Sequence, residues 1–169
     1  MSEYSKDYVI DIARRTNQNL KDYHGCYDVT QLINSAVGLL ILPHANFYSN
    51  IANSFVSSNV LSALRKAIKN DTYPEDGDSE HIELRDIVKH IRNGIAHSKI
   101  FFEANNGELF EVQILDHRNP YPKKDTETGK WKTLPAADFE IVLSISTLRQ
   151  FMIEFSEAII SSNNDIKGR

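Results

Sequence analysis

The sequence has very little cysteine and no long apolar run. Its single cysteine, Cys26, cannot close a disulfide within the chain, which fits a reducing compartment. The most apolar stretch, residues 36–42 (AVGLLIL), is much shorter than the roughly 20 residues that cross a bilayer, and Pro43 follows it. The polar start, MSEYSKDYVI, has no apolar segment of the kind found in signal peptides. We therefore expect a cytoplasmic protein without a membrane span.

An excess of positive charge is also absent. The chain carries 19 Lys and Arg against 23 Asp and Glu, a formal net charge of −4. Contact with a nucleic acid would therefore depend on a local basic patch. With 41% hydrophobic residues, 7 Gly and 5 Pro, the composition excludes a disordered or repetitive chain. A length of 169 residues predicts a single domain over residues 1–169.

Apolar periodicity predicts that most of the chain is helical. Ser79 or Asp78 is expected to cap the helix that begins near residue 81, and Ser144 or Ser146 the last helix. The Ser/Asn cluster of residues 54–59 leaves open whether the third helical region is one helix or two. The expected helices span about 4–23, 28–43, 47–70, 81–97 and 147–162.

A short β segment is predicted before the last helix. Asn106 and Gly107 are a strong turn signal between apparent strands at 100–103 and 109–115, and 138–144 resembles a third strand. We interpret residues 99–143 as an insertion and residues 163–169 as a loose tail. The predicted fold is mainly α, a helical bundle of four to five helices with a small β-hairpin insertion before the last helix.

The helix predicted at 81–97 separates into two faces when its residues are placed at about 100° intervals. Its apolar face is predicted to pack into the core, while the opposite face would be a polar stripe in which His90 is partly exposed. The apolar face consists of Leu84, Ile87, Val88, Ile91 and Ile95. The polar stripe consists of Glu83, Asp86, His90, Asn93 and His97.

Arg92, Asn93 and His97, within the segment IRNGIAH, are the candidate catalytic residues. RNA carries its own nucleophile, the 2′-OH, so histidine as acid or base and arginine as a phosphate clamp suffice for cleavage. Asn93 would bind a phosphate oxygen or orient the imidazole. His90 and His97 lie roughly 10 Å apart along a helix axis, too far to share a metal ion. We expect neither a metal nor a cofactor.

The motif RNGIAH resembles the Rx4–6H motif of the HEPN superfamily, and Asn93 matches the polar residue that usually follows its arginine. The segments DVTQLINSAVGLLILP and DIVKHI are similar to a bacterial and plasmid-borne branch of that superfamily. The resemblance implies a metal-independent endoribonuclease that acts on RNA as a homodimer with a shared cleft. It also implies a role in toxin–antitoxin or antiphage defence, with a possible antitoxin partner. Lys99 stands where HEPN toxins paired with nucleotidyltransferase antitoxins usually have tyrosine.

Two questions about the site stay open at this point. Arg92 and His97 are five residues apart, which places them about 140° apart around a helix. Either Gly94 bends the helix, or a second subunit completes the site. The alternatives to a nuclease are a plain helix terminus and a non-catalytic HEPN module that binds RNA or a protein. The residues expected to contact the substrate are Arg85, Lys89, His90 and Lys99.

Overall fold

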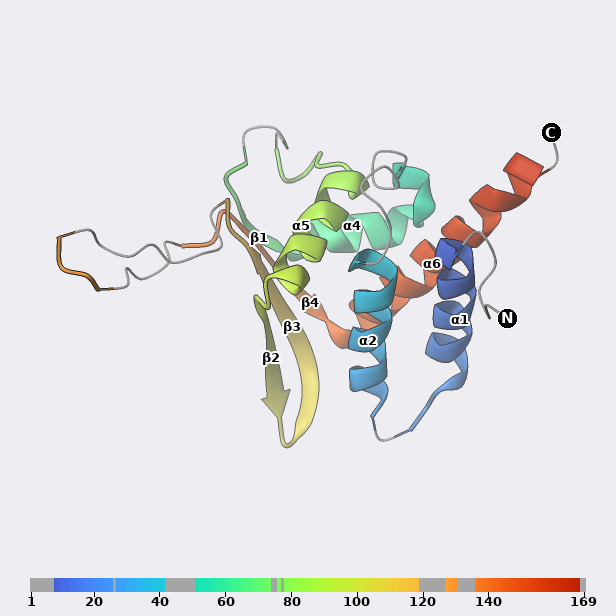
Figure 1. Cartoon of the computed structure of the whole chain (residues 1–169), viewed down its shortest axis with the longest axis horizontal. Coiled ribbons are helices and arrows are strands. Elements are labelled where there is room, and N and C mark those ends of the chain that lie inside the picture. The colour runs from blue at the N-terminus through green and yellow to red at the C-terminus, as the bar shows by residue number, and fades with distance from the viewer. Residues whose placement is uncertain are drawn as a thin grey trace.

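The computed structural model describes residues 8–25, 27–41, 51–73, 76, 78–118, 127–130 and 136–167, with side chains through residue 162 (Figure 1). The elements are α1 (Tyr8–Asp22), α2 (Asp28–Ile41), η1 (Asn53–Phe55), α4 (Ser58–Ala67), β1 (Ile68–Asp71), α5 (Leu84–Ala96), β2 (Ile100–Asn105), β3 (Glu108–Asp116), β4 (Phe139–Ser144) and α6 (Ile145–Lys167). Of the helices in these described ranges, none is long and apolar enough to cross a membrane.

The prediction of a mainly helical bundle with a β insertion was wrong. The described residues form a mixed α/β fold around a four-stranded antiparallel sheet of order β1-β4-β3-β2. Strand β1 precedes α5 in the chain and pairs with β4, with Ile68 opposite Ile141 and Asp71 opposite Phe139. Because three of the four residues of β1 are polar, its sequence, IKND, shows no strand periodicity and was read as a helix end.

The predicted hairpin is confirmed, as is the third strand. β2 pairs with β3 antiparallel, from Ile100 opposite Ile114 to Asn105 opposite Glu108. Asn106 and Gly107 connect them with φ angles of 51° and 84°, as a two-residue turn with two positive φ angles requires. β4 continues the sheet beside β3. The hairpin is therefore half of a larger sheet.

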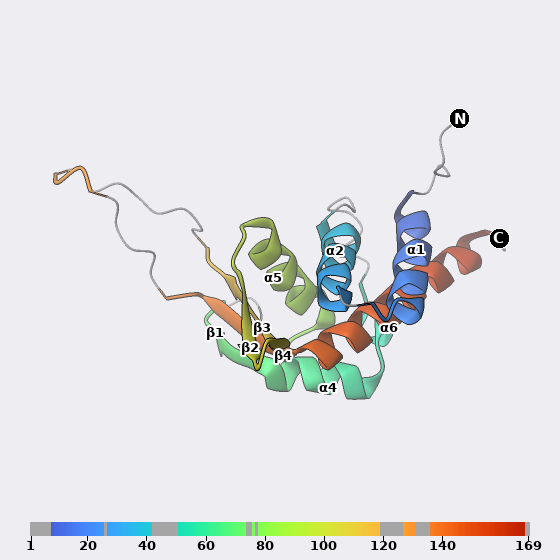
Figure 2. The same ribbon diagram turned by 90° about the horizontal axis from the view of Figure 1, so that it is seen from below.

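Helix α5 packs against one face of this sheet (Figures 1 and 2). Burial alternates along β4, where Phe139, Ile141 and Leu143 are fully buried and the residues between them are partly exposed. Val112 and Ile114 on β3 are fully buried as well. Alternation of this kind is expected for a sheet with one covered face. The apolar face predicted for α5 is confirmed, because its five residues are buried.

Helix α1 packs against α6, which it crosses in Figure 2. Asn17 on α1 donates to Ser156 Oγ on α6 at 3.0 Å, and Arg149 Nη2 on α6 lies 2.8 Å from Asp28 Oδ2 on α2. These polar contacts fix the relative rotation of the three helices around their buried apolar residues. Helix α6 extends to Lys167, five residues beyond its predicted end.

One predicted helix cap is confirmed and another was wrong. Ser144 Oγ accepts a hydrogen bond from the backbone N of Thr147 at 3.1 Å, at the start of α6. Helix α5 begins at Leu84, and the cap there comes from a distant segment. Asn53 Oδ1 in η1 accepts from the backbone N of Leu84 at 2.8 Å. Sequence patterns near residues 78–79 therefore could not reveal it. Of the third predicted helical region, residues 47–50 lie outside the described residues.

Candidate active site

The motif helix α5 runs unbroken from Leu84 to Ala96, so Gly94 does not bend it. Gly94 serves a packing role instead. A Cβ at this position would lie 2.4 Å from Ile114 Cγ2 and 2.8 Å from the backbone oxygen of Leu115. Both distances are shorter than non-bonded atoms tolerate. Glycine is therefore what allows α5 to approach β3 this closely.

His97 occupies the C-cap of α5, just before a left-handed residue. Ser98 has a φ of 56°. The backbone N of Ser98 donates to Ile95 O at 3.0 Å, and that of Lys99 donates to Gly94 O at 2.7 Å. These two bonds form a Schellman motif, which satisfies the last carbonyls of a helix. The chain then turns directly into β2, so His97 is held between α5 and the sheet.

Arg92 and Asn93 are brought together, and Asn93 is tied to the sheet. Arg92 Nη1 donates to Asn93 Oδ1 at 3.3 Å. Asn93 Nδ2 donates to Asp116 Oδ2, at the end of β3, at 3.2 Å. Because α5 has no break, the backbone positions of Arg92 and His97 keep the divergence of about 140° that a regular helix imposes.

His90 is fully buried, so the prediction that it is partly exposed and contacts the substrate was wrong. Its Nδ1 lies 2.7 Å from Asp116 Oδ2 and its Nε2 lies 2.5 Å from Asp76 Oδ2. The rings of Tyr73 and Phe139 pack on the imidazole, each with a centroid distance of 4.4 Å. The helical wheel missed this arrangement because four non-local residues cover that side of α5. These residues are Tyr73, Asp76, Asp116 and Phe139. They lie outside the motif, and nothing in the sequence near them indicates that they contact His90.

The electrostatics of the cluster favour a protonated His90. Burial lowers the pKa of His90, but the hydrogen bonds and negative charges of Asp116 and Asp76 outweigh it, and the net shift is upward. The pKa of Asp76 is raised, because burial and the charges of Asp71 and Asp86 outweigh the lowering effect of His90. Tyr73 has a raised pKa through burial and the charges of Asp116 and Asp138. A protonated imidazole donates from both nitrogens, which matches its two carboxylate partners.

The predicted substrate-binding cations lie on or next to α5. Arg85, Lys89 and Arg92 follow i, i+4, i+7 spacing and share one side of the helix. The charge of Arg85 is partly neutralised, since its Nη2 lies 3.2 Å from Glu83 and 3.5 Å from Asp86. Lys99 follows the helix at the entry to β2.

Arg118 is a further cation that the sequence prediction missed. Its guanidinium carbon lies 4.9 Å from the Tyr73 ring centroid, and Lys89 Nζ lies 5.8 Å from the same centroid. Arg118 Nε also lies 3.6 Å from Asp138 Oδ1. Its side chain is about half exposed, so this cation reaches the surface near the Tyr73 ring, which Lys89 also approaches. The pairings of β3 with β4 and of β4 with β1 bring it there, and no local sequence pattern signals it.

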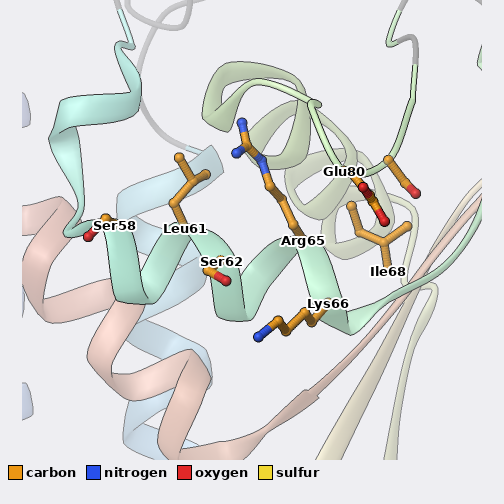
Figure 3. Close-up of a pocket in the computed structure, with 8 residues that line it drawn as sticks. Ser58, Leu61, Ser62, Arg65, Lys66, Ile68 and Glu80 are labelled. Atoms are coloured by element: carbon orange, nitrogen blue, oxygen red, sulfur yellow. The ribbon is translucent and has the colours of Figure 1, made fainter.

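A pocket beside α4 also contains two cations, but they do not converge (Figure 3). Arg65 extends toward the start of α5 and donates to Ile82 O from Nε at 3.0 Å and from Nη2 at 2.8 Å. Lys66 points away from Arg65 in Figure 3. Arg65 therefore ties α4 to the segment before α5, and the pocket offers no paired cations to a phosphate.

Comparison with known protein families shows the family of the chain. The family model described as HEPN pEK499 p136 matches residues 1–166. The chain belongs to this HEPN family. No curated protein and no solved structure gives a match. In this HEPN domain, Arg92 and Asn93 lie near the end of α5 and His97 forms its C-cap.

Proposed function

We propose that this HEPN protein is an endoribonuclease that cleaves RNA without a metal ion, at a composite site formed by two subunits. Arg92 binds the scissile phosphate, His97 transfers protons, and Asn93 orients Arg92. One observation carries the proposal: in this member of a HEPN family, the residues of the Rx4–6H motif lie at the end of one helix. Arg92 and Asn93 are also hydrogen-bonded to each other there. Lys89 and Arg118 lie nearby to bind neighbouring phosphates.

The chemistry uses the nucleophile that RNA itself supplies. A neutral His97 accepts the proton of the 2′-OH, and the 2′-oxygen attacks the adjacent phosphorus. The bond from phosphorus to the 5′-oxygen breaks, and a protonated histidine gives a proton to that oxygen. The products are a 2′,3′-cyclic phosphate and a 5′-hydroxyl. The guanidinium fork of Arg92 stabilises the charge that develops on the phosphoryl oxygens.

A homodimer resolves the divergence of Arg92 and His97 around α5. With about 140° between them, one subunit presents the two groups in different directions. A twofold axis near the end of α5 would place the Arg92 of one subunit opposite the His97 of its partner. Two histidines in one cleft would also supply the base and the acid that the reaction needs. We place this enzyme in toxin–antitoxin or antiphage defence, where RNA cleavage arrests growth and an antitoxin partner restrains it.

The test is cleavage of several unrelated RNAs in the presence of EDTA. We expect Arg92→Ala and His97→Ala to lower the cleavage rate by about 100-fold or more, as loss of a catalytic acid or base does. Arg14→Ala and His81→Ala are matched controls, because both side chains are exposed and lie outside the motif. Wild-type protein that leaves all RNAs intact, with and without added divalent metal, would refute the proposal.

The second candidate function is a non-catalytic HEPN module that binds RNA or a partner protein through the same surface. Two observations favour it: the net charge of −4, and the divergence of Arg92 and His97 within one subunit. It predicts binding that survives His97→Ala with no cleavage by the wild type. Measuring RNA affinity and cleavage on the same samples separates the two functions.

A further inference from the structure

The carboxylate of Asp116 joins the buried histidine to the motif. Its Oδ2 accepts from Asn93 Nδ2 at 3.2 Å and lies 2.7 Å from His90 Nδ1. His90 and Asn93 are one turn apart on α5, so the end of β3 contacts both from the same side. Since the amide nitrogen of Asn93 faces Asp116, its oxygen is left to accept from Arg92 Nη1 at 3.3 Å. A continuous chain of hydrogen bonds therefore leads from His90 to Arg92.

The other end of this chain is buried. Asp76 Oδ2 lies 2.5 Å from His90 Nε2, and the imidazole is packed between Tyr73 and Phe139. The side chains of His90 and Asp76 are completely inaccessible to solvent, and that of Asp116 is 4% exposed. With both ring nitrogens engaged and aromatic rings packed against the imidazole, His90 cannot rotate without breaking the cluster. The position of Asp116 is thereby fixed.

We propose that Asp116 is a positioning residue, whose carboxylate is clamped by His90 and Asp76 and in turn orients Asn93 and Arg92 for phosphate binding. The effect of Asp116 on RNA cleavage rests on the proposed ribonuclease function. The link from His90 through Asp116 to Asn93 does not depend on that function. His90, Asp76 and Asp116 are all buried, so none of the three touches the substrate. Asp116 therefore acts on the reaction through Asn93.

The clamp depends on the charge of His90. An imidazolium donates from both nitrogens, whereas a neutral ring has one N–H and must lose its donation to Asp116 or to Asp76. Loss of the proton therefore breaks one of the two links, between His90 and Asp116 or between His90 and Asp76, and weakens the chain that holds Asn93. The charged and titratable groups around the cluster come from α5, from the segments before it, and from both central strands. They are Asp71, Tyr73, Asp76, Asp86, Lys89, Arg92, Asp116, Arg118 and Asp138.

The experiment compares Asp116→Asn with the wild type by RNA cleavage kinetics and by NMR of the Asn93 side-chain amide. Displacement of Arg92 by about 1 Å is expected to lower kcat about 100-fold, with KM changed less than threefold. In the wild type, the Asn93 amide protons are expected to exchange slowly with water, and their shifts are expected to follow the titration of His90. Both properties should be lost in Asp116→Asn. Asp28→Asn is the matched control, because it removes a carboxylate paired with Arg149, away from the motif.

Each outcome decides the proposal. An Asp116→Asn protein that is folded and cleaves at the wild-type rate overturns it, as do Asn93 amide signals that stay unchanged. If Asp116→Asn does not fold, Asp76→Asn removes the far anchor and leaves Asp116 in place. It should shift the alkaline limb of the kcat profile to lower pH, and an unshifted profile overturns the proposal. If the wild type cleaves no RNA, the ribonuclease proposal fails, and the Asn93 signals still decide whether Asp116 positions that residue.

Discussion

Gly94 on α5 and Ile114 on β3 approach so closely that a Cβ on the glycine would lie 2.4 Å from Ile114 Cγ2. The backbone oxygen of Leu115 stands 2.8 Å from the same point and has less freedom to move than a side chain. The glycine of the RNGIAH motif thus sets the distance between the motif helix and the sheet. A larger residue at this position would push α5 away from β3, and this effect does not depend on the chemistry of the neighbouring residues.

We predict that Gly94→Ala lowers the free energy of unfolding by about 2 kcal/mol, because overpacking outweighs the gain in helix propensity. Gly38→Ala in α2 is the matched control, since among the described residues a Cβ there would meet only Ile12 Cγ2, at 3.9 Å. This control should gain about 1 kcal/mol, as alanine does over glycine within a helix. Urea denaturation of both variants measures the two values. Equal effects in the two helices would contradict the packing role of Gly94.

Ser98→Gly should stabilise the protein. Ser98 holds a φ of 56°, which costs a residue with a side chain more than it costs glycine. Relief of this strain is expected to exceed the entropy that glycine adds to the unfolded chain, for a net gain of about 0.5–1 kcal/mol. Ser98→Ala retains the strain and should lie close to the wild type. Thermal melts of the three proteins provide the comparison, and a less stable Ser98→Gly would rule out strain at this residue.

Asn53→Ala should destabilise α5, although Asn53 lies 31 positions before the amide that it caps. Its Oδ1 accepts from the backbone N of Leu84 at 2.8 Å, a donor that the helix itself cannot satisfy. Loss of such a cap costs about 1 kcal/mol. The neighbouring exposed residue Ser54 provides the control variant, Ser54→Ala. Hydrogen exchange of the first-turn amides of α5 should accelerate in Asn53→Ala alone.

Stability should fall as pH rises above neutrality. The raised pKa of His90 means that the folded protein holds a proton that the unfolded chain releases near pH 6.5. The stabilisation is therefore complete below pH 6.5 and is lost as pH rises through the higher pKa of the folded state. The free energy of unfolding should decrease by up to about 1.4 kcal/mol per pH unit in that range.

The variant His90→Gln isolates this effect. Glutamine does not titrate, so the slope of unfolding free energy against pH between 6.5 and 9 should be clearly smaller in the variant. Chemical denaturation at several pH values gives both slopes. Equal slopes in the wild type and the variant would show that His90 is not the group whose proton makes stability depend on pH.

Local patterns were enough to predict α5 and the hairpin. The apolar face of α5 follows helical spacing over its full length, and Asn106-Gly107 fixes a two-residue turn. The family was also predictable, because the resemblance starts from a contiguous motif, RNGIAH, and the match over residues 1–166 confirms the predicted family. Asn93 and Arg92 are adjacent in the chain, so their contact needs no long-range information.

Features that depend on chain segments far apart in sequence were not predictable. β1 has few apolar residues, and only its pairing with β4, about 70 residues later, makes it a strand. His90 looked like a surface residue because a helical wheel contains no information about what covers the helix. Asp76, Asp116 and Phe139 reach it from three separate segments. The same limit applies to Asn53, which caps α5 from across the fold.

The pairing of β1 with β4 has a consequence for synthesis of the chain on the ribosome. α5 and the motif emerge before β4, and the sheet that supports them is completed only by residues 139–144. Until that strand leaves the ribosome, Phe139 cannot pack on His90 and β1 has no partner. Long-range pairings of this kind form late because of the loop that they must close. The nascent chain thus carries the motif, from the synthesis of residue 97 to that of residue 144, without the scaffold that arranges it.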